Sequence, residues 1–148
     1  MILLDTNVIS EIMRPHPDPA VTTWIQSVPR KEFWTSSVVV AEILSGIDLM
    51  PAGRRQEGLR EAVEEMIAED FHDQILNFDL AAARHFGQIL SARQRIGLPI
   101  NEMDAQIAAT ARVYGATVAT RNIRDFLACD LALVNPWSDN PQESRRRQ

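Results

Sequence analysis

Residues 1–10, with the sequence MILLDTNVIS, decide the fold. The apolar residues 2–4 predict a short buried strand, and Asp5 stands where that strand ends. Burying a carboxylate costs free energy unless the group is hydrogen-bonded or holds a ligand. Two interpretations are open here: Asp5, Thr6 or Asn7 is the N-cap of a following helix, or Asp5 belongs to a functional site. The second gains weight only if the chain brings other acids to the same place.

The composition is that of an ordinary globular domain. The chain has 148 residues, 45% of them hydrophobic and 24% charged, which suits one domain with a real core. No apolar run approaches the ~20 residues that cross a bilayer, and no signal-peptide layout is present, so we expect a cytoplasmic protein without a membrane partner. The single Cys129 cannot form an intramolecular disulfide. The net charge of −5 argues against a broadly basic nucleic-acid-binding face.

Short apolar runs alternate with amphipathic stretches along the whole chain. Besides residues 2–4, four runs predict strands: 33–37, 74–78, 116–120 and 131–135. Helical spacing and capping residues predict helices over 6–14, 18–28, 38–50, 54–71, 79–97 and 101–115, and a short one over 121–127. Strands separated by helices predict parallel strands joined by crossover helices, an α/β fold. We expect one domain over residues 1–137 and a disordered tail over residues 138–148.

Two acids stand where the first two predicted strands lead into helices. Asp5 ends the first strand, and Glu42 lies early in the helix that follows strand 33–37. The neighbours of Glu42 in SSVVVAEILSG are nearly all apolar, which is unusual for a solubilising surface acid. Ligands of open α/β sheets bind outside the carboxyl ends of the strands, where these two acids should lie. The alternative is that Glu42 lies on an exposed helix face.

Two further acids are expected at the same edge of the sheet. Asp104 lies in the first turn of the helix that Asn101 opens, and Asp125 follows strand 116–120 in the segment ATRNIRDF. Each has a local alternative, because acids are favoured in the first turn of a helix. We expect Asn122 to cap the short helix that contains Asp125.

An all-carboxylate cluster predicts a particular class of metal. Carboxylates packed together repel, and at least one is protonated unless a cation is present. Oxygen ligands without Cys or His suit Mg²⁺ or Mn²⁺ rather than zinc. The three histidines lack metal-ligand spacing, so we interpret them as structural or surface residues: His16, His72 and His85.

Four segments, in this order and spacing, resemble one known family: LLDTNVISE, SSVVVAEILSG, NEMDAQIAATA and ATVATRNIRDF. They are similar to the PIN-domain ribonucleases, in particular the VapC/FitB-type toxins of bacterial toxin–antitoxin pairs, from residue 1 to about residue 137. The resemblance implies a PIN-like three-layer α/β/α sandwich with a central, mainly parallel sheet. It also implies an endoribonuclease that uses Mg²⁺ or Mn²⁺ to hydrolyse RNA, forms a homodimer and is neutralised by a cognate antitoxin protein.

The resemblance also assigns roles to residues. Asp5, Glu42 and Asp104 match the family's acidic metal-binding triad, and Thr6 matches the small hydroxyl residue beside the first Asp. We expect Asp5 and Asp104 to hold the metal, and Glu42 to be a ligand or to position the attacking water.

The fourth position departs from the family pattern. Asn122 stands where the family often has an Asp, and Asp125 comes three residues later. Either residue could fill the fourth position, and the site could hold one metal ion or two. Two other functions would also use an acid at the end of the first strand or explain the acids without catalysis. A haloacid-dehalogenase-like phosphatase with Asp5 as phosphoryl acceptor is disfavoured, because Asn7 stands where a second Asp is required. A non-catalytic RNA- or protein-binding α/β module, with the acids as caps and surface groups, is the remaining alternative.

Overall fold

A parallel sheet forms the centre of the computed structural model, which describes residues 1–138. Within these residues the sheet has five strands in the spatial order β3-β2-β1-β4-β5, and every neighbouring pair is parallel. The strands are β1 (Ile2–Leu4), β2 (Phe33–Ser36), β3 (Ile75–Leu76), β4 (Thr117–Ala119) and β5 (Leu133–Val134). The predicted α/β class with a parallel sheet is therefore confirmed. The predicted tail lies outside the described residues from residue 139 onward.

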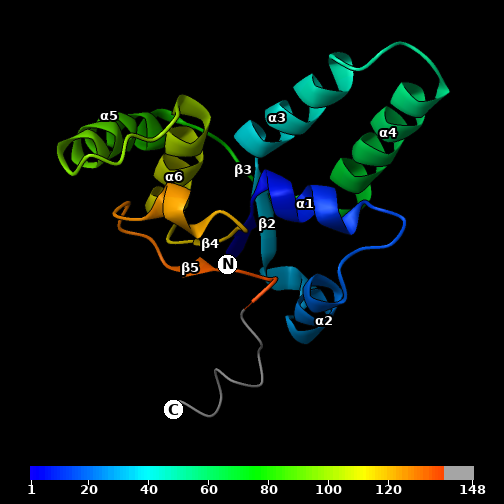
Figure 1. Cartoon of the computed structure of the whole chain (residues 1–148), viewed down its shortest axis with the longest axis horizontal. Helices are drawn as coiled ribbons and strands as arrows, with labels where there is room; N and C mark the ends of the chain where they lie inside the picture. The colour runs from blue at the N-terminus through cyan, green and yellow to red at the C-terminus, as the bar shows by residue number, and fades with distance from the viewer. Residues whose placement is uncertain (139–148) are drawn as a thin grey trace.

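Six α-helices of the described chain connect the strands: α1 (Thr6–Ile12), α2 (Pro19–Ser27), α3 (Ser37–Asp48), α4 (Arg54–Glu65), α5 (Leu80–Arg95) and α6 (Glu102–Tyr114). Three short turns of other helix types complete them: η1 (Arg30–Glu32), η2 (Met66–Asp70) and η3 (Ile123–Phe126). Crossovers between parallel strands are right-handed, so the strand order puts α1–α4 on one face and α5, α6 and η3 on the other. Figure 1 shows α5 and α6 together on the left of the sheet, with α1, α3 and α4 on its right. None of the described helices is long and apolar enough to cross a membrane.

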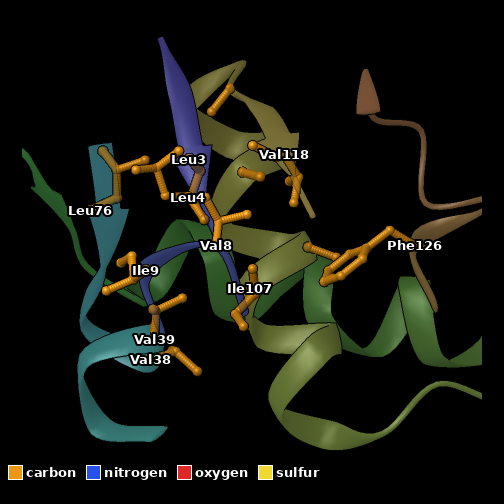
Figure 2. Close-up of a cluster of buried hydrophobic side chains, with 14 of the residues drawn as sticks. Leu3, Leu4, Val8, Ile9, Val38, Val39, Leu76, Ile107, Val118 and Phe126 are labelled. Carbon is orange, nitrogen blue, oxygen red and sulfur yellow. The ribbon is translucent and has the colours of Figure 1, made fainter. Parts of the chain in front are cut away.

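The core lies between the sheet and the helices that follow its central strands. Leu3 of β1 and Val118 of β4 are fully buried, as are Val8 of α1, Val39 of α3 and Ile107 of α6. Figure 2 shows these side chains in one cluster. Burying each contributes about 1.5–3 kcal/mol relative to leaving it exposed. The packing fixes the carboxyl ends of β1 and β4 against the starts of the three helices.

Helix caps agree with the predicted starts, with one exception. The side chains of Ser36, Asp79 and Asn101 accept hydrogen bonds from backbone N–H groups in the first turns of α3, α5 and α6. Gly115 ends α6 in the left-handed conformation, with φ of 66°, that glycine adopts without strain. The predicted short helix is present and begins directly after Asn122, but the prediction that Asn122 caps it with its side chain is wrong. The segment is the 3₁₀ turn η3, and the Asn122 side chain forms no capping hydrogen bond because its backbone (φ −97°, ψ 61°) is not in the extended conformation of a cap.

Candidate functional site

Asp5 both caps a helix and belongs to a buried polar network. Its carboxyl group is only 5% exposed. Oδ1 accepts a hydrogen bond from the backbone N–H of Thr6 at 2.8 Å. Oδ2 accepts from the Thr120 hydroxyl at 2.8 Å and from the Asn7 side-chain amide at 3.1 Å. The two interpretations of the first strand are therefore compatible, since each carboxylate oxygen serves one of them.

Thr120 connects two strands of the sheet at this edge. The β1–β4 register pairs Leu4 with Ala119, which places Asp5 opposite Thr120. Thr120 is fully buried, and its hydroxyl oxygen accepts from the backbone N–H of Asn122 at 3.0 Å while donating to Asp5. Neither Thr120 nor Asn7 was predicted as a site residue. The sequence feature that could have indicated Thr120 is its position directly after β4, which matches the position of Asp5 directly after β1.

Glu42 faces the site rather than solvent. Its side chain is partly buried on α3, and Oε2 accepts a hydrogen bond from the Thr6 hydroxyl at 2.6 Å. Burial is the main cause that raises the pKa of Asp5, and the charge of Glu42 raises it further. The hydrogen bonds from Thr120, Thr6 and Asn7 act in the opposite direction, because they stabilise the ionised form.

Asp104 is paired with the residue that caps its helix. The Asn101 side chain accepts from the Asp104 N–H at 2.8 Å, as an N-cap does, and its amide nitrogen donates to Oδ2 of Asp104 at 2.6 Å. The pKa of Asp104 is raised from 3.8 to about 6, first by burial and then by the charge of Asp5. Asp125 and Glu42 raise it as well, while the Asn101 hydrogen bond lowers it. The other three predicted acids therefore lie within electrostatic range of Asp104.

Asp125 and Asn122 are the least enclosed of the predicted residues. Both are exposed, and the backbone N–H of Asp125 donates to the carbonyl of Asn122 at 3.0 Å. Asp125 contributes to the site through its charge, which acts on Asp104. The charge effect alone does not make either residue a ligand, so the fourth position stays a prediction.

The donor chemistry fits a hydrated divalent cation. In residues 1–138, no group of three or more His, Cys, Asp or Glu side chains is arranged to hold a metal ion. Mg²⁺ is usually bound by one or two carboxylates and keeps several water ligands, so it does not require such a cage. Two acids with raised pKa values, Asp5 and Asp104, mark a region where a positive charge is favourable.

A cavity of about 410 Å³ lies beside these acids, among residues of α1, α3 and α4. Thr6 and Glu42 line it together with two arginines, Arg14 and Arg55. Guanidinium groups bind phosphate in a two-pronged geometry. An acidic centre bordered by arginines suits a substrate that carries phosphodiester groups.

Comparison with known proteins identifies the family of this chain. Residues 2–130 match the PIN domain family. The plasmid stability protein StbB of Pseudomonas syringae pv. tomato is 42% identical over 137 residues, which cover 93% of this chain and 99% of StbB. Toxin FitB of Neisseria gonorrhoeae is 42% identical over 139 residues, which cover 94% of this chain and 100% of FitB.

The solved structures agree with the sequence comparison. The chain superposes on the structure of FitAB bound to an IR36 DNA fragment with a TM-score of 0.87 and 41% identity, over 95% of this chain and 98% of that chain. The VapC ribonuclease Y4jK of Sinorhizobium fredii is 38% identical over 93% of this chain and 98% of its own length. This chain therefore belongs to the PIN-domain family, in the group that includes FitB and the VapC ribonucleases.

Proposed function

We propose that this protein is a Mg²⁺- or Mn²⁺-dependent endoribonuclease and the toxin of a toxin–antitoxin pair. The observation that carries the proposal is the network that joins Asp5 and Glu42 through Thr6 and lies within electrostatic range of Asp104. The relatives support it by name, since FitB is called a toxin and Y4jK a ribonuclease. Support for the chemistry comes from the all-oxygen donor set, which is typical of Mg²⁺ and Mn²⁺ sites.

In this proposal each residue of the network has a separate role. Asp5 and Asp104 hold the cation, which when bound lowers the pKa of a water ligand and neutralises charge on the phosphodiester oxygens. Thr120 and Asn7 keep the Asp5 carboxylate in one orientation. Thr6 binds Oε2 of Glu42, which leaves Oε1 of Glu42 to accept the proton of the attacking water.

The proposed partners are RNA, an antitoxin protein and a second copy of the chain. The FitAB structure contains FitB-type toxin together with FitA and a DNA fragment, and by analogy an antitoxin would cover the acidic centre of this protein. The cavity with Arg14 and Arg55 provides a place where an RNA backbone could contact the protein next to the acids.

A cleavage assay with purified, antitoxin-free protein tests the proposal. We expect RNA to be cut with Mg²⁺ or Mn²⁺ and to stay intact with EDTA. Glu42→Gln should fold but be nearly inactive, while Glu57→Gln, on the exposed face of α4, should cleave like the wild type. Cleavage that persists in EDTA, or a fully active Glu42→Gln protein, would contradict the mechanism. Binding of RNA without cleavage would favour the non-catalytic module.

Metal binding is measured separately by thermal unfolding. A cation that binds only the folded state raises the melting temperature. Mn²⁺ should raise that of the wild type, and Asp5→Asn and Asp104→Asn should lose most of the shift. Glu102→Gln is the matched control, because it removes an exposed acid from the same first turn of α6.

A further inference from the structure

A buried arginine, Arg93, contacts the segments that lie next to Asp104 and Asp125. Arg93, in the last turn of α5, is only 3% exposed. A buried guanidinium is costly unless its N–H groups are hydrogen-bonded. Arg93 donates three hydrogen bonds to backbone carbonyl oxygens: Nε donates to Leu98 at 2.5 Å, and Nη1 donates to Arg124 at 3.1 Å and to Leu127 at 2.7 Å.

These three carbonyls belong to two segments: one leads to Asp104, and the other contains Asp125. Leu98 lies three residues before Asn101, the cap whose side chain binds Asp104, and its N–H also donates to the Arg93 carbonyl at 3.0 Å. Arg124 and Leu127 stand on either side of Asp125 in the sequence and belong to the η3 turn and its end. One side chain thus ties the segment leading to Asp104 to the segment holding Asp125.

The chain after η3 needs such support. Ala128 and Asp130 both adopt the left-handed conformation, with φ of 59° and 56°, which is unfavourable for residues other than glycine. Conformations of this kind persist only where the surroundings hold them. Two arginines do so here: Arg93 binds the carbonyl of Leu127, and Arg112 of α6 binds the carbonyl of Cys129 with Nε at 3.0 Å and Nη2 at 2.7 Å.

We infer that Arg93 is a positioning residue, which sets the distance between Asp104 and Asp125 by holding both of their segments. The inference rests on the proposed function and adds a residue that touches neither substrate nor cation. Arg112 contacts the same turn from α6, through the carbonyl of Cys129, whereas the carbonyls of Leu98, Arg124 and Leu127 bind Arg93. Arg112 is therefore a matched control within the chain.

The test compares Arg93→Met and Arg93→Lys with Arg112→Met and Arg112→Lys in the full-length protein. Each variant is assayed at a temperature where circular dichroism shows that it is folded, for kcat and KM on RNA and for Mn²⁺ affinity by calorimetry. Loss of a residue that orients metal ligands typically costs about 10–100-fold in metal affinity or activity, so we expect that loss in kcat and Mn²⁺ affinity for Arg93→Met, with KM little changed. Arg93→Lys should recover part of it, because the ammonium retains the charge and can donate to some of the three carbonyls.

Both arginine-to-methionine changes should lower the melting temperature, but the Arg112 variants should keep near wild-type kcat and Mn²⁺ affinity. Equal losses for the two positions, or a folded Arg93→Met protein with wild-type kinetics, would overturn the inference. If Arg93→Met does not fold, the lysine pair decides in the same way. A wild-type protein that binds Mn²⁺ but does not cleave RNA would refute the proposed function alone, and the Mn²⁺ affinities of the variants would then decide the role of Arg93. A wild type that binds no Mn²⁺ would refute both.

Discussion

The two halves of the acidic site are built differently. On the sheet side, Asp5 is buried at the end of β1 and receives three hydrogen bonds from side chains and backbone nearby. On the helix side, Asp104 is partly buried in the first turn of α6, and Asp125 is exposed in η3. Asp5 is therefore held by several hydrogen bonds at a buried strand end, whereas Asp104 and Asp125 lie in less enclosed surroundings.

The difference bears on the proposed metal-dependent mechanism. If Asp5 holds the cation, its fixed carboxylate would orient that cation without reorganisation during the reaction. Both Asp5 and Asp104 have raised pKa values, with burial as the largest cause. Three hydrogen bonds oppose the rise in the pKa of Asp5, whereas one, from Asn101, opposes the rise in the pKa of Asp104. The helix side should therefore respond more to pH and ionic conditions than the sheet side.

The largest expected effect comes from disturbing the fixed half. Thr120→Val keeps the shape of the side chain but removes a donor from the buried Asp5 carboxylate. Leaving a buried acceptor without its partner costs about 1–3 kcal/mol of stability, and misorienting the ligand should lower kcat by about 10-fold or more. Thermal unfolding and single-turnover cleavage measure the two effects.

Thr110→Val is the matched control for this change. Thr110 is also fully buried, but its hydroxyl donates to the carbonyl of Gln106 within α6. It should cost stability without a comparable loss of kcat. Similar kcat values for the two variants would show that Asp5 does not need Thr120, and the contrast between the two halves would be lost.

The sequence predicted the acids of both halves but only part of what holds them. The positions of Asp5, Glu42 and Asp104 could be predicted because each lies at a strand end or early in a helix, which is local information; their roles stay predictions. The role of Thr120 depends on β4 lying beside β1, and it contacts Asp5 across 115 positions of sequence. The local signal, that Thr120 follows β4 directly, does not show that its hydroxyl binds Asp5.

Arg93 and the edge strands show the same limit. Arg93 reads as a surface charge near a helix end, yet its carbonyl partners include one that lies 34 positions further along the chain. The predicted strands 74–78 and 131–135 are shorter in the structure, as Ile75–Leu76 and Leu133–Val134. β3 and β5 lie at the edges of the sheet, so each has only one neighbouring strand within the described residues to sustain its hydrogen bonds.

A smaller effect is expected from pH, and it reports on the helix side. The pKa of Asp104 is about 6 in the folded protein and 3.8 in the reference state, so the folded state binds the proton more tightly. Between these values the folded protein holds more protons than the unfolded one, and the free energy of unfolding therefore falls as pH rises. After allowance for solvent screening, we expect about 1 kcal/mol between pH 4 and pH 7 in metal-free protein.

Comparing the urea unfolding of the wild type with that of Asp104→Asn measures this contribution together with the coupling between Asp104 and Asp5. Asp104→Asn should be the more stable protein at pH 7 without metal, and Glu102→Gln should follow the wild type. Mn²⁺ affinity of the wild type should decrease as pH falls below about 6, because the cation competes with a proton on Asp104. Parallel stability curves for the wild type and Asp104→Asn would remove Asp104 from the acidic centre.

The smallest effect concerns the fourth position, where Asn122 and Asp125 are the two candidates. Asp125 is exposed, so Asp125→Ala should change the melting temperature little. It should lower kcat several-fold if the carboxylate contributes a ligand, directly or through water. Because its charge helps to raise the pKa of Asp104, its removal should also move the pH dependence of Mn²⁺ binding to lower pH. Asn122→Asp should strengthen binding of a second cation, since a carboxylate is a better ligand for a hard divalent ion than a neutral amide. Calorimetric Mn²⁺ titrations and cleavage rates of the two variants measure these changes. If Asp125→Ala shifts the pH dependence but leaves kcat unchanged, Asp125 acts only through its charge, and the site has three acids rather than four.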